Sequence, residues 1–252
     1  MNEGILHKVR EMNPLVHNMT NQVVMNFSAN GLLALGASPI MANAKEDAAE
    51  VARQSDGLLL NIGTVGEEQL DAMILAGKAA NEQEIPVVID PVGVAATSYR
   101  TKLFESLLSE VQPTVIKGNA GELAHLIGRK LETKGVDFVG ETDPTEVAEE
   151  VARNCGTSVL CTGKTDIVTD GNRTLKNETG TALLTQITGA GCLLGSVVTA
   201  YLSVGEDVLE SAHAAAAYYG KKAEIAASQT DVRGPGTFLS HFIDQLAGED
   251  MG

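Results

Sequence analysis

The residues with the most evident chemical potential lie in the segment ITGAGCLLGSVV, residues 187–198, where a turn of small residues opens an apolar helix. The first amide groups of a helix have no partner inside it, and the helix dipole places positive charge at the same end. We therefore expect Gly189, Ala190 and Gly191 to form an anion hole for a phosphate group or for charge that develops during phosphoryl transfer. A tight helix start packed with small residues would give the same pattern.

Cys192 is the one cysteine of three that stands in the first turn of a helix. The dipole there favours the thiolate, which predicts a reactive side chain with a pKa below the usual value of about 8.5. Cys161 falls in an apolar strand and Cys155 near a helix end, where cysteine usually serves as a small buried hydrophobe. The total of three cysteines is odd, and none of them has C-x-x-C spacing, which argues against a disulfide framework or a zinc site.

Two carboxylates follow apolar runs that have the character of buried strands. Asp90 ends the run VVID, and Glu122 lies in the first helical turn after IKGNA. Ligands of open α/β sheets gather at the carboxyl ends of strands. The pair could hold Mg²⁺ directly or through water, because that ion takes few protein carboxylates. A strand-ending aspartate and a glutamate that complements a helix start are the alternative.

The elements that must position these residues alternate between short apolar strands and helices, which predicts an α/β fold with a mostly parallel sheet. The predicted strands are 15–19, 38–42, 57–62, 86–90, 113–117 and 157–162. Residues 166–171 and 172–177 predict an antiparallel hairpin at the sheet edge, with Asp170 and Gly171 in its turn. Three helical stretches follow from Thr188 onward.

Two of the predicted helices have recognisable ends. Thr20 is the expected N-cap of the helix that follows it, and Asp143 with Pro144 that of a later helix. Gly36 and Gly156 are expected to end these helices, because glycine readily takes the left-handed conformation of a C-cap.

Composition bounds the class of protein. The 252 residues, 44% of them hydrophobic, can bury a substantial core, and we expect one α/β domain over residues 1–252 with a surface excursion at 128–144. With 18 basic and 33 acidic residues, the net charge of −15 argues against nucleic acid and anionic membranes as partners. The sequence has no evident signal peptide or membrane span, so we expect a soluble, cytoplasmic protein.

The TGAGC turn before a long apolar helix resembles the C-terminal signature of ribokinase-like kinases, whose turn usually ends in a catalytic aspartate. Cys192 stands in place of that aspartate, which is the mark of the hydroxyethylthiazole kinases. The chain is similar to that family over nearly its whole length, in the segments NPLVHNMTN (13–21), GASPIMANA (36–44), NIGT (61–64), VVIDPVG (87–93), IKGNAGE (116–122) and CTGKTDIVTDG (161–171).

The resemblance implies a ribokinase-like three-layer α/β/α fold and a role in thiamine biosynthesis or salvage. The implied reaction is phosphorylation of the hydroxyethyl group of 4-methyl-5-(2-hydroxyethyl)thiazole, with ATP as co-substrate and Mg²⁺ as cofactor. It further implies a homotrimer with active sites at subunit interfaces.

The resemblance also assigns roles to individual residues. Cys192 takes the catalytic position, and Asp90 and Glu122 belong to the metal and phosphate region. The ATP-binding positions are Lys117, Thr162 and Gly163, and the substrate-binding positions are Asn21, Met41 and Gly189. Lys117 is a departure, because family members often carry arginine there, and lysine keeps the charge but loses the bidentate fork.

The residues themselves leave some of these roles open. Asn21 follows a strand, where its amide could cap a helix or face a ligand. Met41 could be core filler, although its polarizable sulfur suits the face of a sulfur-containing ring. Thr162 could be an ordinary turn residue.

Three other functions are compatible with the chemistry of these motifs. One is a thiol enzyme that uses Cys192 as a covalent nucleophile, which would need a neighbouring base. Another is a different ribokinase-like activity, such as a vitamin or pyrimidine kinase or a hydrate dehydratase, although those relatives normally carry aspartate in the turn. The third is a nucleotide-binding protein without catalysis.

Overall fold

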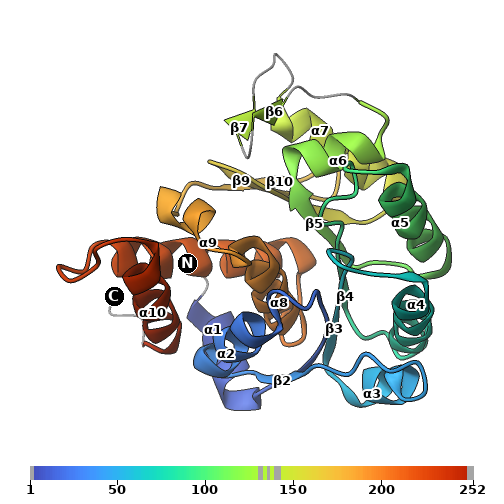
Figure 1. Ribbon diagram of the computed structural model, residues 1–252, viewed down its shortest axis with the longest axis horizontal. Coiled ribbons are helices and arrows are strands. Elements are labelled where there is room, and N and C mark those ends of the chain that lie inside the picture. Colours follow the sequence, from blue (N-terminus) through green and yellow to red (C-terminus); the bar gives the residue numbers. More distant parts are fainter. Residues whose placement is uncertain (1–2, 130–132, 135–136, 139–142, 249–252) are drawn as a thin grey trace.

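The computed structural model describes residues 3–129, 133–134, 137–138 and 143–248. Its centre is an eight-stranded sheet in the order β10-β9-β8-β5-β4-β3-β1-β2 (Figure 1). The six strands from β8 to β2 are parallel, and β9 and β10 form an antiparallel hairpin at one edge, which confirms the predicted fold. The strands are β1 Leu15–Met19, β2 Ser38–Ile40, β3 Gly57–Asn61, β4 Val87–Asp90, β5 Val115–Asn119, β8 Ser158–Thr162, β9 Asp166–Thr169 and β10 Thr174–Asn177.

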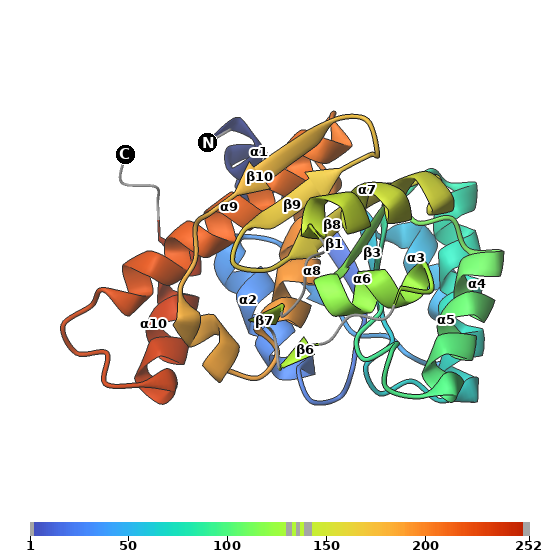
Figure 2. The ribbon, with the colours of Figure 1, turned by 90° about the horizontal axis from the view of Figure 1, so that it is seen from above.

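Helices cover both faces of the sheet (Figures 1 and 2). One face packs against α1 Glu3–Met12, α2 Met25–Leu35, α8 Ala190–Leu202, α9 Val208–Ala227 and α10 Pro235–Ala247. The opposite face packs against α3 Ala48–Gln54, α4 Glu67–Glu82, α5 Ser98–Glu110, α6 Ala120–Leu126 and α7 Pro144–Cys155. A 3₁₀ helix, η1 Ala182–Gln186, precedes α8. None of the helices within the described residues is long and apolar enough to cross a membrane.

Alternation along each strand decides which side chains meet α8. In β3, Leu58 and Leu60 face the α3 and α4 side, whereas Leu59 faces the α8 side. Successive strand residues point to opposite faces. Asn61, two residues after Leu59, therefore faces α8, and the same argument applies to Asp90 two residues after Val88.

Several predicted ends agree with the structure. Asp143 caps α7 by accepting a hydrogen bond from the amide of Thr145, and Pro144 is its first residue. Gly36 and Gly156 end their helices in the left-handed conformation, with φ of 104° and 61°.

The prediction that Thr20 caps the next helix is wrong. Helix α2 begins at Met25, and its N-cap position is Val24, which makes no side-chain cap. The Oγ1 atom of Thr20 is buried and has no hydrogen-bond partner among the residues that the structure describes. The chain instead turns through residues 21–24, where the amide of Val24 donates to the carbonyl of Asn21, and this turn leaves the Asn21 side chain free to face the sheet.

Two strand limits differ from the sequence pattern. Strand β2 stops at Ile40, so Met41 follows the strand instead of lying in it. Strand β5 continues to Asn119, because its pairing with β8 extends to Asn119 and Thr162. The predicted surface excursion at 128–144 lies largely outside the described residues, but β6 Thr133–Lys134 and β7 Asp137–Phe138 within it form a separate antiparallel pair.

Candidate active site

The amino end of α8 lies at the carboxyl edge of the sheet. Its N-cap, Gly189, has φ of 88°, a conformation that favours glycine, and a Cβ atom there would lie 2.5 Å from Cγ1 of Val24. The amide of Leu193 makes an α-helical bond of 2.8 Å to the carbonyl of Gly189. The amides of residues 190–192 precede this bond, and such groups at a positive helix end can bind an anion.

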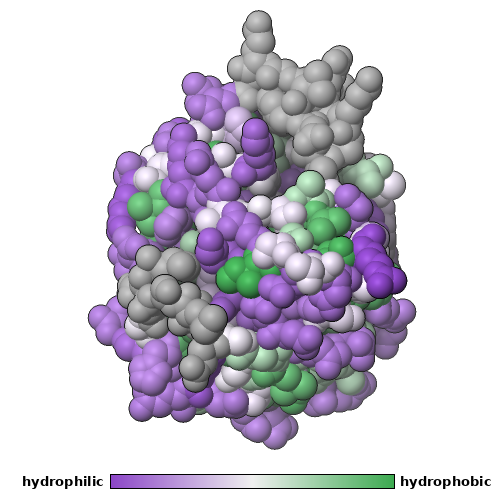
Figure 3. All heavy atoms as spheres, turned by 90° about the vertical axis from the view of Figure 1, so that its left-hand side faces the viewer, coloured by the Kyte–Doolittle hydropathy of each residue, from purple (hydrophilic) through white to green (hydrophobic). Residues whose placement is uncertain are grey.

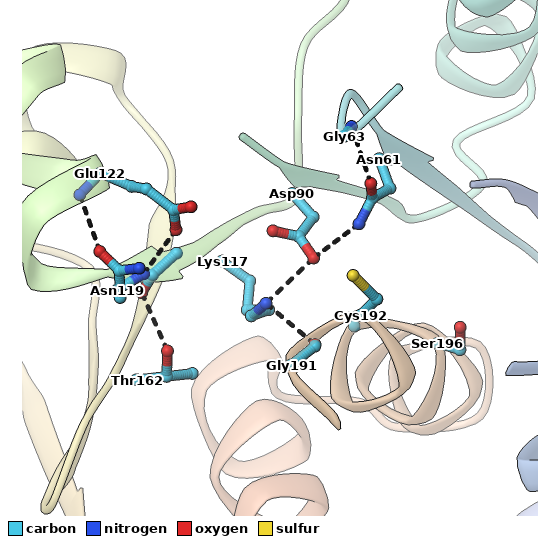
Figure 4. A network of polar contacts seen from close by, with 12 residues as sticks. Asn61, Gly63, Asp90, Lys117, Asn119, Glu122, Thr162, Gly191, Cys192 and Ser196 are labelled. Atoms are coloured by element: carbon cyan, nitrogen blue, oxygen red, sulfur yellow. Dashed lines mark hydrogen bonds and ion pairs between the residues drawn. The ribbon is translucent and has the colours of Figure 1, made fainter. Parts of the chain in front are cut away.

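Polar residues at the ends of neighbouring strands face this helix start (Figure 4). The nitrogen of the Asn61 amide donates to Oδ2 of Asp90 at 2.9 Å. Lys117 Nζ donates to the same oxygen at 3.0 Å and to the carbonyl of Gly191 at 2.9 Å. A single buried ammonium group therefore joins the end of β4 to the first turn of α8.

The thiol of Cys192 completes a ring of contacts. Nδ2 of Asn21 lies 3.4 Å from the sulfur and 3.1 Å from Oδ1 of Asn61. The ring runs from Cys192 through Asn21 and Asn61 to Asp90, and returns through Lys117 to the residue before Cys192. The structure thus brings together five of the predicted site residues, Asn21, Asp90, Lys117, Gly191 and Cys192, and adds Asn61.

Burial sets the charge of the central pair. Burial raises the pKa of Asp90 to about 6, with Lys117 opposing the shift and Glu122 adding to it. Burial alone would lower the pKa of Lys117, but the negative charges of Asp90 and Glu122, together with the hydrogen bond to Asp90, outweigh burial and raise that pKa. Lys117 is therefore protonated at neutral pH and places a positive charge beside the start of α8.

The prediction of a low pKa for Cys192 is wrong. Burial raises its pKa, and the carboxylate of Asp90 adds to the increase, while Lys117 and the amides of Asn61 and Asn21 oppose it. Cys192 is only 8% exposed, and the loss of thiolate hydration on burial is the largest contribution to this increase. The side chain is therefore a neutral thiol at neutral pH.

Glu122 lies beside this network on the first turn of α6 (Figure 4). Its two carboxylate oxygens accept from the amides of Gly93 and Asn119, both at 2.9 Å. These bonds join the ends of β4 and β5 and hold Glu122 within electrostatic reach of Asp90. The position agrees with the prediction that the two carboxylates occupy one region.

The donor set fits Mg²⁺ with few protein ligands. Oδ1 of Asp90 is buried and has no hydrogen-bond partner within the described part of the chain, whereas Oδ2 accepts hydrogen bonds from two donors. Among the described residues, no group of three or more histidine, cysteine, aspartate or glutamate side chains could hold a metal ion by itself. Mg²⁺ usually keeps several waters and takes one or two carboxylates together with substrate phosphates. Asp90, with Glu122 acting through water, could supply such a site.

The predicted ATP-binding residues beyond Lys117 lie at the end of β8. Thr162 is half-buried and donates to the carbonyl of Gly118 at 3.4 Å. Gly163 is exposed, and its amide donates to Oδ1 of Asp166 at 3.1 Å, so this amide is already engaged. Met41 is half-buried beyond the edge strand β2, and no hydrogen bond within the described residues links it to the Cys192 ring.

Comparison with known proteins agrees with this geometry. The model of the family described as "HK: Hydroxyethylthiazole kinase family" matches residues 6–249. The chain is 49% identical over 247 residues to Hydroxyethylthiazole kinase 1 of Oceanobacillus iheyensis, which covers 98% of this chain and 96% of that protein. The chain belongs to the hydroxyethylthiazole kinase family.

Solved structures of similar proteins extend the comparison. A hydroxyethylthiazole kinase of Pyrococcus horikoshii matches with a TM-score of 0.88 and 39% identity, over 97% of this chain and 91% of that one. A ribokinase-like superfamily protein of Enterococcus faecalis matches with a TM-score of 0.70 and 12% identity, over 98% and 94% of the two chains. The second likeness confirms the ribokinase-like fold that the sequence predicts.

Membership of the hydroxyethylthiazole kinase family bears on the alternatives. A thiol nucleophile needs a base beside it, but the hydrogen-bond partner of the Cys192 sulfur is the amide of Asn21. The raised pKa of Cys192 also opposes a covalent role at neutral pH.

Two residues of this kinase site are missing from the sequence-based prediction. Asn61 ends β3 and pairs in register with Asp90, which ends β4. Comparing the polar residues at the ends of neighbouring predicted strands could have identified Asn61. Arg100 of α5 donates to the carbonyls of Ile62 at 3.1 Å and Val92 at 3.2 Å. It thereby ties the loops after β3 and β4 together, and no sequence pattern marks that role.

Proposed function

We propose that this chain transfers the γ-phosphoryl group of ATP to the hydroxyl of 4-methyl-5-(2-hydroxyethyl)thiazole, as part of thiamine biosynthesis or salvage. The observation that carries the proposal is the position of the Cys192 thiol in the first turn of α8, joined through Asn21 and Asn61 to the Asp90–Lys117 pair. The neutral thiol and amide groups therefore lie beside the ammonium group of Lys117 and the start of α8.

The helix start and Lys117 would bind the transferring group. In this proposal the amides of Gly189, Ala190 and Gly191 form the anion hole, and the ammonium of Lys117 adds a fixed positive charge beneath it. The hydroxyl oxygen attacks the γ-phosphorus as the bond to the β-phosphate oxygen breaks, and ADP leaves. Positioning and charge stabilisation supply most of the catalysis of phosphoryl transfer.

Cys192 is the proposed catalytic residue that contacts the substrate hydroxyl. Its neutral thiol is a weak base, and it suits a reaction in which the hydroxyl loses its proton late, after the bond to phosphorus has formed. We expect the thiol to orient the hydroxyl for in-line attack and the released proton to pass to the phosphorylated product or to water.

Mg²⁺ fits the proposal as the cofactor, held by Asp90 and, through water, by Glu122. When bound, Mg²⁺ neutralises charge on the phosphates of ATP. The chain's own contribution is to hold both carboxylates still, because Asn61, Lys117 and two backbone amides fix their oxygens.

The remaining predicted site residues divide between the thiazole alcohol and ATP. We propose that Asn21, Met41 and Gly189 bind the thiazole alcohol, and that Thr162 and Gly163 bind ATP together with Lys117. The amide of Gly163 faces Asp166, so Gly163 would approach the nucleotide through its exposed Cα and carbonyl. ATP supply favours the cytoplasm as the place of action.

A homotrimer with interfacial active sites is also proposed. Val23, in the turn that carries Asn21, is 68% exposed, and Leu33, in the last turn of α2, is 60% exposed. The side of the molecule that includes α10 has several hydrophobic patches within a hydrophilic surface (Figure 3). Light scattering of the purified protein would test the assembly, and a monomer at micromolar concentration would refute it.

The activity is tested by ATP consumption with Mg²⁺ and the thiazole alcohol. A hydroxymethylpyrimidine and a reaction without acceptor serve as the comparisons. Turnover with the thiazole alone is the expected result. Turnover with the pyrimidine alone would leave the fold and the phosphate chemistry in place but would overturn the proposed substrate.

A further inference from the structure

Asn61 has a single permitted orientation of its side-chain amide. It is fully buried, its nitrogen donates to Oδ2 of Asp90 at 2.9 Å, and its oxygen accepts from the amide of Gly63 at 3.0 Å. Turning the amide over would set two donors against each other at Gly63 and two acceptors against each other at Asp90. The neighbours on both sides therefore fix which end of Asn61 faces which partner.

The orientation of Asn61 dictates that of Asn21. Because Oδ1 of Asn61 is an acceptor, Asn21 turns its nitrogen toward it at 3.1 Å, and the same nitrogen lies 3.4 Å from the sulfur of Cys192. Oδ1 of Asn21 has no hydrogen-bond partner among the described residues, and it is not one of their fully buried unpaired atoms. This oxygen therefore has free acceptor capacity beside the thiol, in a residue that is 5% exposed.

We propose that Asn61 is a positioning residue that locks the Asn21 amide with its nitrogen on the Cys192 sulfur and its oxygen toward the substrate hydroxyl. The inference rests on the proposed function and gives Asn21 a specific task within it. In the thiazole alcohol, the hydroxyl is the one group with a polar hydrogen to donate, since the ring nitrogen and sulfur carry none. An acceptor fixed at this point selects the alcohol and directs its oxygen toward the thiol.

The inference is tested by binding of two thiazoles in the absence of ATP. Titration calorimetry compares 4-methyl-5-(2-hydroxyethyl)thiazole with 5-ethyl-4-methylthiazole, which lacks the hydroxyl. The unaltered protein should bind the alcohol roughly fivefold to tenfold more tightly, the value of one hydrogen bond. Asn21→Ala and Asn61→Ala should each lose most of this preference, and the double variant should lose no more than either single one.

One further variant separates orientation from general damage. Asn81 provides the matched control. Its side-chain amide donates to the carbonyl of Gln112 and accepts from the amide of Gln112, both at 2.8 Å, and these bonds lie at the opposite edge of the sheet. Asn81→Ala should retain the preference in full.

The possible outcomes are distinct. If the unaltered protein binds neither thiazole, the proposed function falls and this inference falls with it. If it binds both equally, the acceptor role of Asn21 is overturned without any reliance on a variant. If Asn61→Ala keeps the preference, or if the effects of the two alanine substitutions add, Asn61 does not act through Asn21.

Discussion

Lys117 and Asp90 form a buried ion pair, with Nζ 3.0 Å from Oδ2 and the two side chains 5% and 0% exposed. The lysine also donates to the carbonyl of Gly191, so the ion pair connects the first turn of α8 to the sheet. Buried pairs stabilise a fold less than their geometry suggests, because both charges lose their hydration. This pair therefore matters more for the placement of charge in the site than for net stability.

Removing one partner of that pair should be costly. Lys117→Met leaves the Asp90 carboxylate buried without its cation, and we expect a loss of about 3–5 kcal/mol in the free energy of unfolding. Lys45→Met is the control, because Lys45 and its partner Asp71 are both about half exposed, and such pairs contribute about 0–1 kcal/mol. Urea denaturation of both variants measures the difference, and equal losses would contradict the assignment.

Two glycines of the α8 turn should respond differently to alanine. Gly189→Ala forces a side chain into φ of 88° and against Val24, and we expect a loss of about 1–3 kcal/mol in stability. At Gly191 a Cβ atom would lie 3.5 Å from Lys117 Nζ, an ordinary contact. Gly191→Ala should therefore melt near the unaltered protein, yet lose at least about tenfold in kcat/KM for ATP, because the methyl group narrows the phosphate cradle.

The raised pKa of Cys192 predicts slow alkylation at neutral pH. Because the thiolate is the reactive form, the rate with iodoacetamide should rise about tenfold per pH unit from pH 7 toward pH 9. Mass spectrometry of the modified peptide distinguishes Cys192 from Cys155 and Cys161. A rate that is already at its plateau at pH 7 would show that the thiolate predominates there.

Cys192→Ser should keep substantial kinase activity, since the reaction needs no strong base.

His17 should make the fold sensitive to mild acid. Burial lowers its pKa, although its hydrogen bond to the carbonyl of Ala42 and the charge of Asp47 oppose the shift. The unfolded chain then binds a proton that the folded chain does not, so stability is full above about pH 6.5 and falls as the pH drops below it, by up to about 1.4 kcal/mol per pH unit.

The substitution His17→Gln isolates this effect. Glutamine can still donate to the carbonyl of Ala42, which lies 2.7 Å from the histidine ring, but it does not titrate. The difference in unfolding free energy between the two proteins should change between pH 8 and pH 5. A constant difference would show that His17 keeps its ordinary pKa.

Much of the fold follows from local patterns. The strands are short apolar runs, and Asp143 and Gly156 mark the ends of α7 through their own chemistry. Thr20 shows the limit of such patterns, because a good capping residue stands there while the helix begins at Met25. Residues 21–24 form a turn before the helix, in which the Asn21 side chain contacts Asn61 and Cys192. These partners are distant in sequence, so a local pattern does not reveal the contacts.

The positions of site residues at strand ends could be predicted from the sequence. Properties that depend on burial, such as the pKa of Cys192, could not. The proposed roles of Asp90, Glu122 and Lys117 follow from their residue types and from their positions at the ends of strands or at a helix start. The pKa of Cys192 depends on how deeply α8 packs and on its distance from Asp90, which lies 102 positions away in sequence (192 − 90). A helix start alone predicts the opposite direction of shift.

The two donors on Oδ2 of Asp90 also bear on the choice between divalent ions. With Asn61 and Lys117 on that oxygen, Asp90 has only Oδ1 left to offer. Calcium favours about six to eight oxygens and often takes both oxygens of one carboxylate, whereas magnesium accepts single oxygens within a compact octahedron of water. A calcium ion would have to break a buried hydrogen bond to gain its second oxygen, so at the proposed metal site this carboxylate would favour an ion that accepts single oxygens.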